Sequence, residues 1–182
     1  NASQVEIMFE ETKKHLGTVS LLVNNTGISQ QKLFTDITEA EWDTMFSVNV
    51  KSMFLCCRQA LTDMIHNKNG KIINISSMWG QVGASCEVHY SASKAAVIGL
   101  TKALAKEVGP SHIQVNCVAP GVIKTAMNSH LDKQTLEMLK EETPLGVIGT
   151  TEDVAQMVGF LASDHSDFIT GQVFGINGGM VI

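Results

Sequence analysis

The sequence predicts an α/β domain with three layers, in which a parallel sheet lies between two layers of helices. Along the 182 residues, short apolar runs of strand length alternate with longer segments that have helical periodicity. The apolar runs also end in polar or glycine-containing turns, as buried parallel strands do. One domain over residues 1–182 is the simplest organisation for a chain of this length.

Composition excludes several classes of protein. The hydrophobic content of 44% and the charged content of 17% suit a globular protein with a substantial core. The formal net charge of −5 and the scattered lysines and arginines argue against a nucleic-acid partner. No apolar run approaches the length of a membrane span. Four cysteines without a C-x-x-C pattern predict reduced thiols, no metal site and a cytoplasmic location.

The first half of the chain predicts two helices and two strands. Residues 3–16 carry apolar side chains at helical spacing, and the short apolar run 19–23 ends in a polar turn, which predicts a buried strand. A Thr-x-x-Glu capping box at residue 38 opens a long helix that runs to about residue 66. Within that helix Asn49 stands among apolar residues, which suggests a buried, functional amide. Residues 71–77 form the next strand.

The second half continues the alternation. A face of small residues predicts a closely packed helix over 88–108, which a Gly-Pro pair ends. The apolar run 113–119 is the third strand, and 132–142 is a weakly amphipathic helix. A second capping sequence opens a helix over 151–163, and 171–176 is the last strand.

The only tyrosine of the chain, Tyr90, has Lys94 four residues later. On a helix these side chains share one face, with Cβ atoms about 5–6 Å apart. At that distance an ammonium is expected to lower the pKa of a phenol by about two units, which suits proton transfer near neutral pH. The alternative is a partly buried tyrosine beside a solvated lysine. We expect His89 to lie at the surface or at the edge of a pocket rather than to act as a base.

Several motifs together resemble the short-chain dehydrogenase/reductase family over the whole chain. The resemblance implies a Rossmann-like, doubly wound parallel sheet. Within the family, the sequence looks most like bacterial 3-oxoacyl-[acyl-carrier-protein] reductases. The motifs that carry the resemblance are Asn24-Asn25-Thr26-Gly27, Asn49, Ser77 thirteen residues before Tyr90-x-x-x-Lys94, Pro120-Gly121-x-x-x-Thr125 and Asn177-Gly178-Gly179.

The resemblance also implies roles for individual residues. Tyr90 would donate a proton to the substrate carbonyl, and Lys94 would lower the pKa of Tyr90 and hold the nicotinamide ribose. Ser77, which the spacing favours over Ser76, would polarise the carbonyl. Asn49 would hold a water that links Lys94 to solvent. The residues expected at the cofactor are Asn24, Gly27, Tyr90, Lys94, Pro120, Gly121, Ile123 and Thr125.

The implied reaction is hydride transfer from NAD(P)H to a carbonyl, most simply reduction of 3-oxoacyl-[acyl-carrier-protein] in fatty acid biosynthesis. NADP(H) is expected in preference to NAD(H), and the expected assembly is a homo-oligomer, a dimer or a homotetramer. In it helices 40–66 and 88–108 would pair, and the end 178–182 would be buried at a second contact. Residues 122–145 are expected to form a lid over a substrate that the sequence does not specify.

Three departures from the family pattern affect these expectations. Thr26 stands where alanine is usual, and Ser111 stands where a carrier-docking arginine is frequent. Lys68, Lys71 and His112 remain as candidates for docking an acidic carrier. The strand and Gly-rich turn that receive the pyrophosphate are not found in these residues. We therefore expect residues 1–182 to correspond to the C-terminal two-thirds to three-quarters of the fold, and to be inactive alone.

Two rival functions stay open at this point. A polyol or secondary-alcohol dehydrogenase of the same family would use the same residues. From a different class, a catalytically inactive remnant could serve as an interface module, because its two long helices could still pair without a cofactor.

Overall fold

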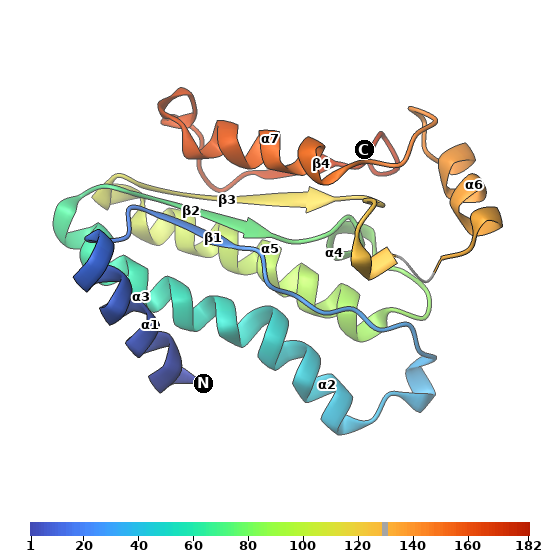
Figure 1. The fold of residues 1–182 in the computed structure, drawn as a ribbon, viewed down its shortest axis with the longest axis horizontal. Coiled ribbons are helices and arrows are strands. Elements are labelled where there is room, and N and C mark those ends of the chain that lie inside the picture. The colour runs from blue at the N-terminus through green and yellow to red at the C-terminus, as the bar shows by residue number, and fades with distance from the viewer. Residues whose placement is uncertain (129–130) are drawn as a thin grey trace.

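A four-stranded parallel sheet organises the protein (Figure 1). The computed structural model describes residues 1–128 and 131–182, so Ser129 and His130 of the expected lid lie outside the described residues. The strands follow one another in space as they do in sequence. They are β1 (Leu21–Asn24), β2 (Gly70–Ile75), β3 (Ile113–Pro120) and β4 (Val173–Ile176).

Helices cover both faces of the sheet, and two more lie beyond the carboxyl ends of the strands (Figure 1). One face carries α3 and α5, with α1 packed on α3, and the opposite face carries α7. The helices are α1 (Ala2–Leu16), α2 (Glu39–Phe46), α3 (Ser52–Asn67), α4 (Trp79–Val82), α5 (Val88–Val108), α6 (Lys133–Glu142) and α7 (Thr151–Ala162). Short 3-10 turns are Phe34–Asp36, Gly109–Ser111, Ala126–Asn128 and Asp164–Ser166. The predicted three-layer α/β/α fold is confirmed.

Two apolar cores form because successive side chains of a strand point to opposite faces. Ile72 of β2 and Val115 of β3 belong to the core under α3 and α5. Ile73 and Ile75 of β2, together with Val118 of β3, which pairs with Ile75, belong to the core under α7. The nearly continuous apolar runs of these two strands therefore reflect burial on both faces.

Strand β1 lies at an edge of the sheet. Among the described residues it pairs only with β2, and its side chains alternate in exposure, with Leu21 at 41% and Val23 at 38%. The run 19–23 was predicted to be a buried strand. Its strand character is confirmed, but in this structure one of its faces is open.

The predicted helix from residue 38 to about residue 66 is present and has no gap. Its hydrogen-bond pattern changes in the middle. Between α2 and α3, residues Ser47–Lys51 form a π-helix. A π-turn holds one extra residue and so turns a side chain away from its α-helical direction. Asn49 sits inside this turn and is 1% exposed. The capping box that opens the helix is present as predicted, with Thr38 and Glu41 each bonding the other's backbone.

A short helix that the sequence did not predict, α4, packs tightly against α5. A Cβ added to Gly80 of α4 would lie 2.7 Å from the backbone carbon of Lys94 and 2.8 Å from Ser76 Oγ. Backbone atoms cannot move aside as a flexible side chain can. Only glycine therefore allows this approach of α4 to the helix that carries Tyr90.

We expect Gly80→Ala to destabilise the protein by about 1–3 kcal/mol, because the added methyl group must push α4 away from α5. The measurement is the free energy of unfolding in urea. Gly159→Ala in α7 is the matched control. No atom lies within 4 Å of a Cβ added there, so it should be neutral or stabilising by up to about 1 kcal/mol. Equal effects of the two substitutions would contradict the close contact.

Candidate active site

Four residues that the sequence selected meet at the carboxyl ends of the strands. Gly27 follows β1, Ser77 follows β2, Gly121 follows β3, and Tyr90 lies in the first turn of α5. All four line one cleft of about 810 Å³. Loops at the carboxyl ends of the strands are the usual ligand site of open α/β folds. The cleft is therefore the candidate active site.

Ser77 and Tyr90 both line the cleft, and the Ser77 hydroxyl is close enough to act on the pKa of the Tyr90 phenol. Both are nearly buried, at 7% and 8% exposure. Ser77 Oγ also accepts a hydrogen bond of 3.2 Å from the backbone N of Trp79, which orients it. Ser76, by contrast, donates to the carbonyl oxygen of Lys94 at 2.7 Å and serves helix packing. The geometry thus brings Ser77, and not Ser76, to Tyr90.

The pKa of Tyr90 is raised, so the prediction that Lys94 lowers it below its ordinary value is wrong. Burial of the phenol is the main cause, since a phenolate there would lose its hydration. The Ser77 hydroxyl acts in the opposite direction, and the negative charge of Glu87 adds to the increase. Lys94 does not compensate, because its Nζ lies 5.8 Å from the ring centroid and is directed to another acceptor.

Lys94 lies beneath the turn that follows β1. Its Nζ donates to the carbonyl oxygen of Ile75 at 2.9 Å, and the residue is 4% exposed. Burial lowers the pKa of Lys94 to about 8. A Cβ on Gly27 would come within 3.2 Å of Nζ, so the absence of a side chain at this position gives the ammonium its space.

Asn49 holds the same turn from the other side. Its Oδ1 accepts from the backbone N of Ile28 at 2.8 Å, and its Nδ2 donates to the Ile28 carbonyl at 2.9 Å and to Ser93 Oγ at 2.9 Å. Asn49 Oδ1 would also lie 3.3 Å from a Cβ on Gly27. The side chain therefore fixes the backbone at the entrance to Lys94. The expectation of a buried, functional amide fits this position.

Residues 28–31 form a wall of the cleft, and this segment is held against α5 and the residues just before it. The backbone N of Lys32 donates to the Cys86 carbonyl at 2.7 Å. Gln30 Oε1 lies 2.9 Å from His89 Nε2, and Gln30 Nε2 donates to Glu41 at 2.8 Å. Since the amide of Gln30 presents its oxygen, His89 Nε2 carries the proton in this contact.

His89 is 0% exposed, so the prediction of a surface or pocket-edge histidine is wrong. Its position in sequence could not show this, because the covering residues come from the loop after β1. Its Nδ1 has no hydrogen-bond partner among the described residues. Glu87 is another residue of the cleft that sequence reasoning missed. Its place three residues before Tyr90, one helical turn away, was a usable signal.

Besides Lys94, four residues expected at the cofactor do not line this cleft. Asn24 donates to Asn74 Oδ1 at 2.8 Å, within the sheet. The carbonyl of Pro120 accepts from the Met78 N at 2.9 Å. Ile123 is 8% exposed and forms a bridge with Gly149. Thr125 lines a neighbouring hollow of about 820 Å³. Cofactor contacts of these four residues stay predictions.

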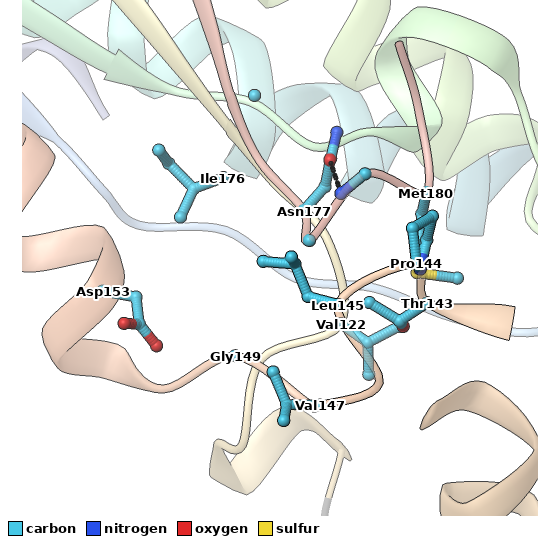
Figure 2. A pocket seen from close by; sticks show the side chains of 13 residues that line it. Val122, Thr143, Pro144, Leu145, Val147, Gly149, Asp153, Ile176, Asn177 and Met180 are labelled. Carbon is cyan, nitrogen blue, oxygen red and sulfur yellow. Dashed lines mark hydrogen bonds between the residues drawn. The ribbon is translucent and has the colours of Figure 1, made fainter. Parts of the chain in front are cut away.

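A separate cavity of about 500 Å³ lies beside the last strand (Figure 2). Figure 2 shows Asn177 turned back toward the Gly179 amide, which donates to its Oδ1 at 3.0 Å. The only charged side chain among the described residues of its lining is that of Asp153, which caps α7 through Thr150. These groups stabilise the turn around Asn177, whose Cα would lie 2.8 Å from a Cβ on Gly121. The turn at Asn177 therefore packs directly against Gly121, which lines the candidate active-site cleft.

The basic residues considered for carrier docking lie at the amino ends of the strands, away from the cleft. Lys68 and His112 precede the amino ends of β2 and β3, whereas the cleft lies at the carboxyl ends. Lys71 is occupied, because its Nζ donates to the Ser163 carbonyl and to Asp167 Oδ1, both at 2.6 Å. Lys71 is therefore not available as a docking residue.

Two further searches concern metals and membranes. Residues 1–128 and 131–182 contain no group of three or more His, Cys, Asp and Glu side chains arranged to hold a metal ion. Among the helices of this described part, none combines the length and apolar character required to cross a bilayer.

Comparison with known proteins places this geometry in context. Residues 1–181 match the family model described as enoyl-(acyl carrier protein) reductase. The 3-oxoacyl-[acyl-carrier-protein] reductase FabG of Thermotoga maritima is 42% identical over 98% of this chain and 73% of its own. Nodulation protein G of Rhizobium meliloti is 39% identical over 100% and 74%. A solved structure from Agrobacterium tumefaciens, described as a gluconate dehydrogenase, has a TM-score of 0.96 at 30% identity, covering 100% of this chain and 74% of that one.

Proposed function

Because the chain belongs to the short-chain dehydrogenase/reductase family, we propose that it is an NAD(P)-dependent carbonyl reductase that acts on 3-oxoacyl thioesters. The family membership supports an NAD(P)-dependent oxidoreductase. The observation that carries the proposed site is the buried Ser77–Tyr90 pair, with Lys94 on the next turn of the same helix. Reduction of an acyl-carrier-bound substrate in fatty acid biosynthesis is the most specific form of the proposal.

The residues around Lys94 fit the nicotinamide half of such a cofactor. An ammonium has three N–H donors, and among the described residues Lys94 gives one of them to Ile75. The other two suit the paired hydroxyls of a ribose. Gly27 and Gly121 leave room beside them for close approach of a ligand to the backbone. We propose NADP(H) in preference to NAD(H), on the resemblance to 3-oxoacyl reductases.

The nicotinamide, when bound, supplies a hydride for the carbonyl carbon. Ser77 would donate a hydrogen bond to the carbonyl oxygen and so favour negative charge on it. Tyr90 would donate its proton to that oxygen as the charge develops. The raised pKa of Tyr90 keeps the phenol protonated before the reaction. Asn49 would hold the turn at Ile28 in place during the step, and the water relay expected from it stays a prediction.

The lining of the cleft favours an acyl substrate over a polyol. A polyol needs several hydrogen-bonding groups around its hydroxyls, whereas an acyl chain needs apolar surface. Apolar side chains make up much of the lining, and they come from the loops after β1, β2 and β3 and from the lid. They are Ile28, Met78, Trp79, Val122, Met127, Leu131 and Leu139. A polyol or secondary-alcohol dehydrogenase is the second candidate, because one solved relative is described as a gluconate dehydrogenase.

The direct test is a reductase assay with NADPH and with NADH. An acetoacetyl thioester should be reduced, and secondary alcohols and polyols should be oxidised far more slowly in the reverse direction. A preference for a polyol would favour the second candidate. Absence of turnover with every carbonyl, in full-length protein that is folded, would favour the catalytically inactive interface module. A cytoplasmic location stays a prediction.

We also propose that the protein is a homo-oligomer, a dimer or a tetramer. The pairing surface would be formed by α3 and α5, where Phe54 is 49% exposed and Ile65 is 47% exposed. Light scattering at micromolar concentration should give at least twice the mass of one chain. Phe54→Asp should reduce that mass, because a carboxylate opposes burial at an apolar contact. Leu16→Asp, on α1 and also exposed, is the matched control and should not change it.

A further inference from the structure

One negative charge lies in the candidate active-site cleft. Glu87 is the only charged side chain among the described residues that line it. Apart from Tyr90, the polar side chains beside it are neutral at every working pH. They are those of Ser29, Gln30, Gln31, Ser77, Asn128 and Thr135. The cleft is therefore mainly apolar, with a carboxylate near the residue proposed to donate the proton.

No cation neutralises this carboxylate within the described part of the chain. Its one hydrogen bond there comes from the neutral amide of Gln31, at 3.2 Å. Lys32, which follows the wall of residues 28–31 and does not line the cleft, is paired with Glu41 at 2.8 Å. Lys94 does not line the cleft and donates to Ile75. Glu87 is also the N-cap residue of α5, yet its side chain makes no capping hydrogen bond.

We propose that Glu87 is a specificity-determining residue that excludes anionic substrates from the cleft and so selects uncharged carbonyl compounds. The inference rests on the proposed reductase function and extends it. A substrate with a carboxylate next to the reacting carbonyl would have to place that carboxylate in the same mainly apolar space as Glu87. It would meet repulsion there without a compensating cation.

The size of the effect depends on the partial exposure of Glu87. Two like charges several ångströms apart repel strongly where the dielectric response is low, but solvent screens a half-buried group. We expect discrimination of about ten-fold. The same charge acts on Tyr90, since Glu87 is one of the groups that raise the pKa of this phenol.

The kinetic test compares two substrates that share a 3-oxo group and differ in charge, ethyl acetoacetate and acetoacetate. At neutral pH the wild-type protein should prefer the ester. Glu87→Gln should improve kcat/KM for acetoacetate relative to the ester by about ten-fold, because it removes the charge and keeps the size. Glu107→Gln is the matched control, since it removes a carboxylate about 30 Å further along the same helix. An unchanged ratio in Glu87→Gln would overturn the proposal.

A second measurement needs no substrate. Tyr90 is the only tyrosine, so the ultraviolet absorbance of phenolate reports its ionisation alone. The groups described around it are Ser77, Glu87, His89 and Lys94, and of these only Glu87 changes in the variant. The midpoint of the titration should move to lower pH in Glu87→Gln and stay in place in Glu107→Gln. An unmoved midpoint would contradict the electrostatic coupling. Absence of reduction with both substrates, together with a moved midpoint, would refute the proposed function and not the influence of Glu87 on the site.

Discussion

Tyr90→Phe is expected to lower kcat/KM for carbonyl reduction by about 10²- to 10⁴-fold, the usual size of a general-acid contribution. Phenylalanine keeps the ring, which is 8% exposed and packed in the first turn of α5, and removes only the hydroxyl. Cofactor affinity, measured by the fluorescence of bound NADPH, should change by no more than a few-fold. The loss should therefore fall on the chemical step.

The same variant contains its own spectroscopic control. Without Tyr90 the chain has no tyrosine, so the phenolate absorbance should disappear completely. Circular dichroism should show that the fold is kept, since only the hydroxyl is removed and the buried ring stays in place. Turnover close to that of the wild type would exclude Tyr90 as the proton donor.

Lys94→Met is expected to lower both kcat/KM, by about 10²-fold or more, and cofactor affinity. Methionine fills the buried space of the lysine stem but provides no donor for a ribose hydroxyl. The two losses should appear together, in an assay and in a binding titration. Cofactor affinity equal to that of the wild type would contradict the proposed ribose contact.

The same substitution should change how stability depends on pH. The folded protein releases the Lys94 proton near pH 8, whereas the unfolded chain keeps it until about pH 10.5. Above pH 8 the unfolded state therefore binds more protons, and the contribution of Lys94 to stability rises with pH. The wild type should gain up to about 1.4 kcal/mol per pH unit relative to Lys94→Met between pH 8 and pH 9. Burial raises the thiol pKa values of Cys57 and Cys117 to about 11, so both thiols stay protonated in the folded wild type up to pH 9. Loss of the Lys94 charge would raise the pKa of Cys117 further, so both thiols stay protonated in the folded variant as well and cancel in the difference.

Urea unfolding of both proteins at pH 7, 8 and 9 provides the measurement. The wild-type curve should rise against the variant curve only above pH 8. Parallel curves over this range would show that Lys94 keeps an ordinary pKa in the folded protein, and that its burial is not electrostatically costly.

Local features of the sequence determined the order of the elements and the central pair of the site. The spacing of Tyr90 and Lys94 is a property of one helix, so it fixed their shared face before any tertiary contact was known. The polar turns that follow the apolar strands indicate that Gly27, Ser77 and Gly121 lie together, because the carboxyl ends of parallel strands lie at the same end of the sheet.

Only the tertiary structure decided the environment of these residues. Burial depends on segments that are distant in sequence. His89 is enclosed by the loop after β1, Asn49 bonds Ile28 from a π-turn, and Tyr90 has a raised pKa because the fold removes its water. The position of Glu87 in the cleft likewise follows from the way residues 28–31 are held against α5 and the residues just before it. Sequence spacing fixes which side chains share an element. The dielectric environment and the charges that surround them arise only when different elements pack together.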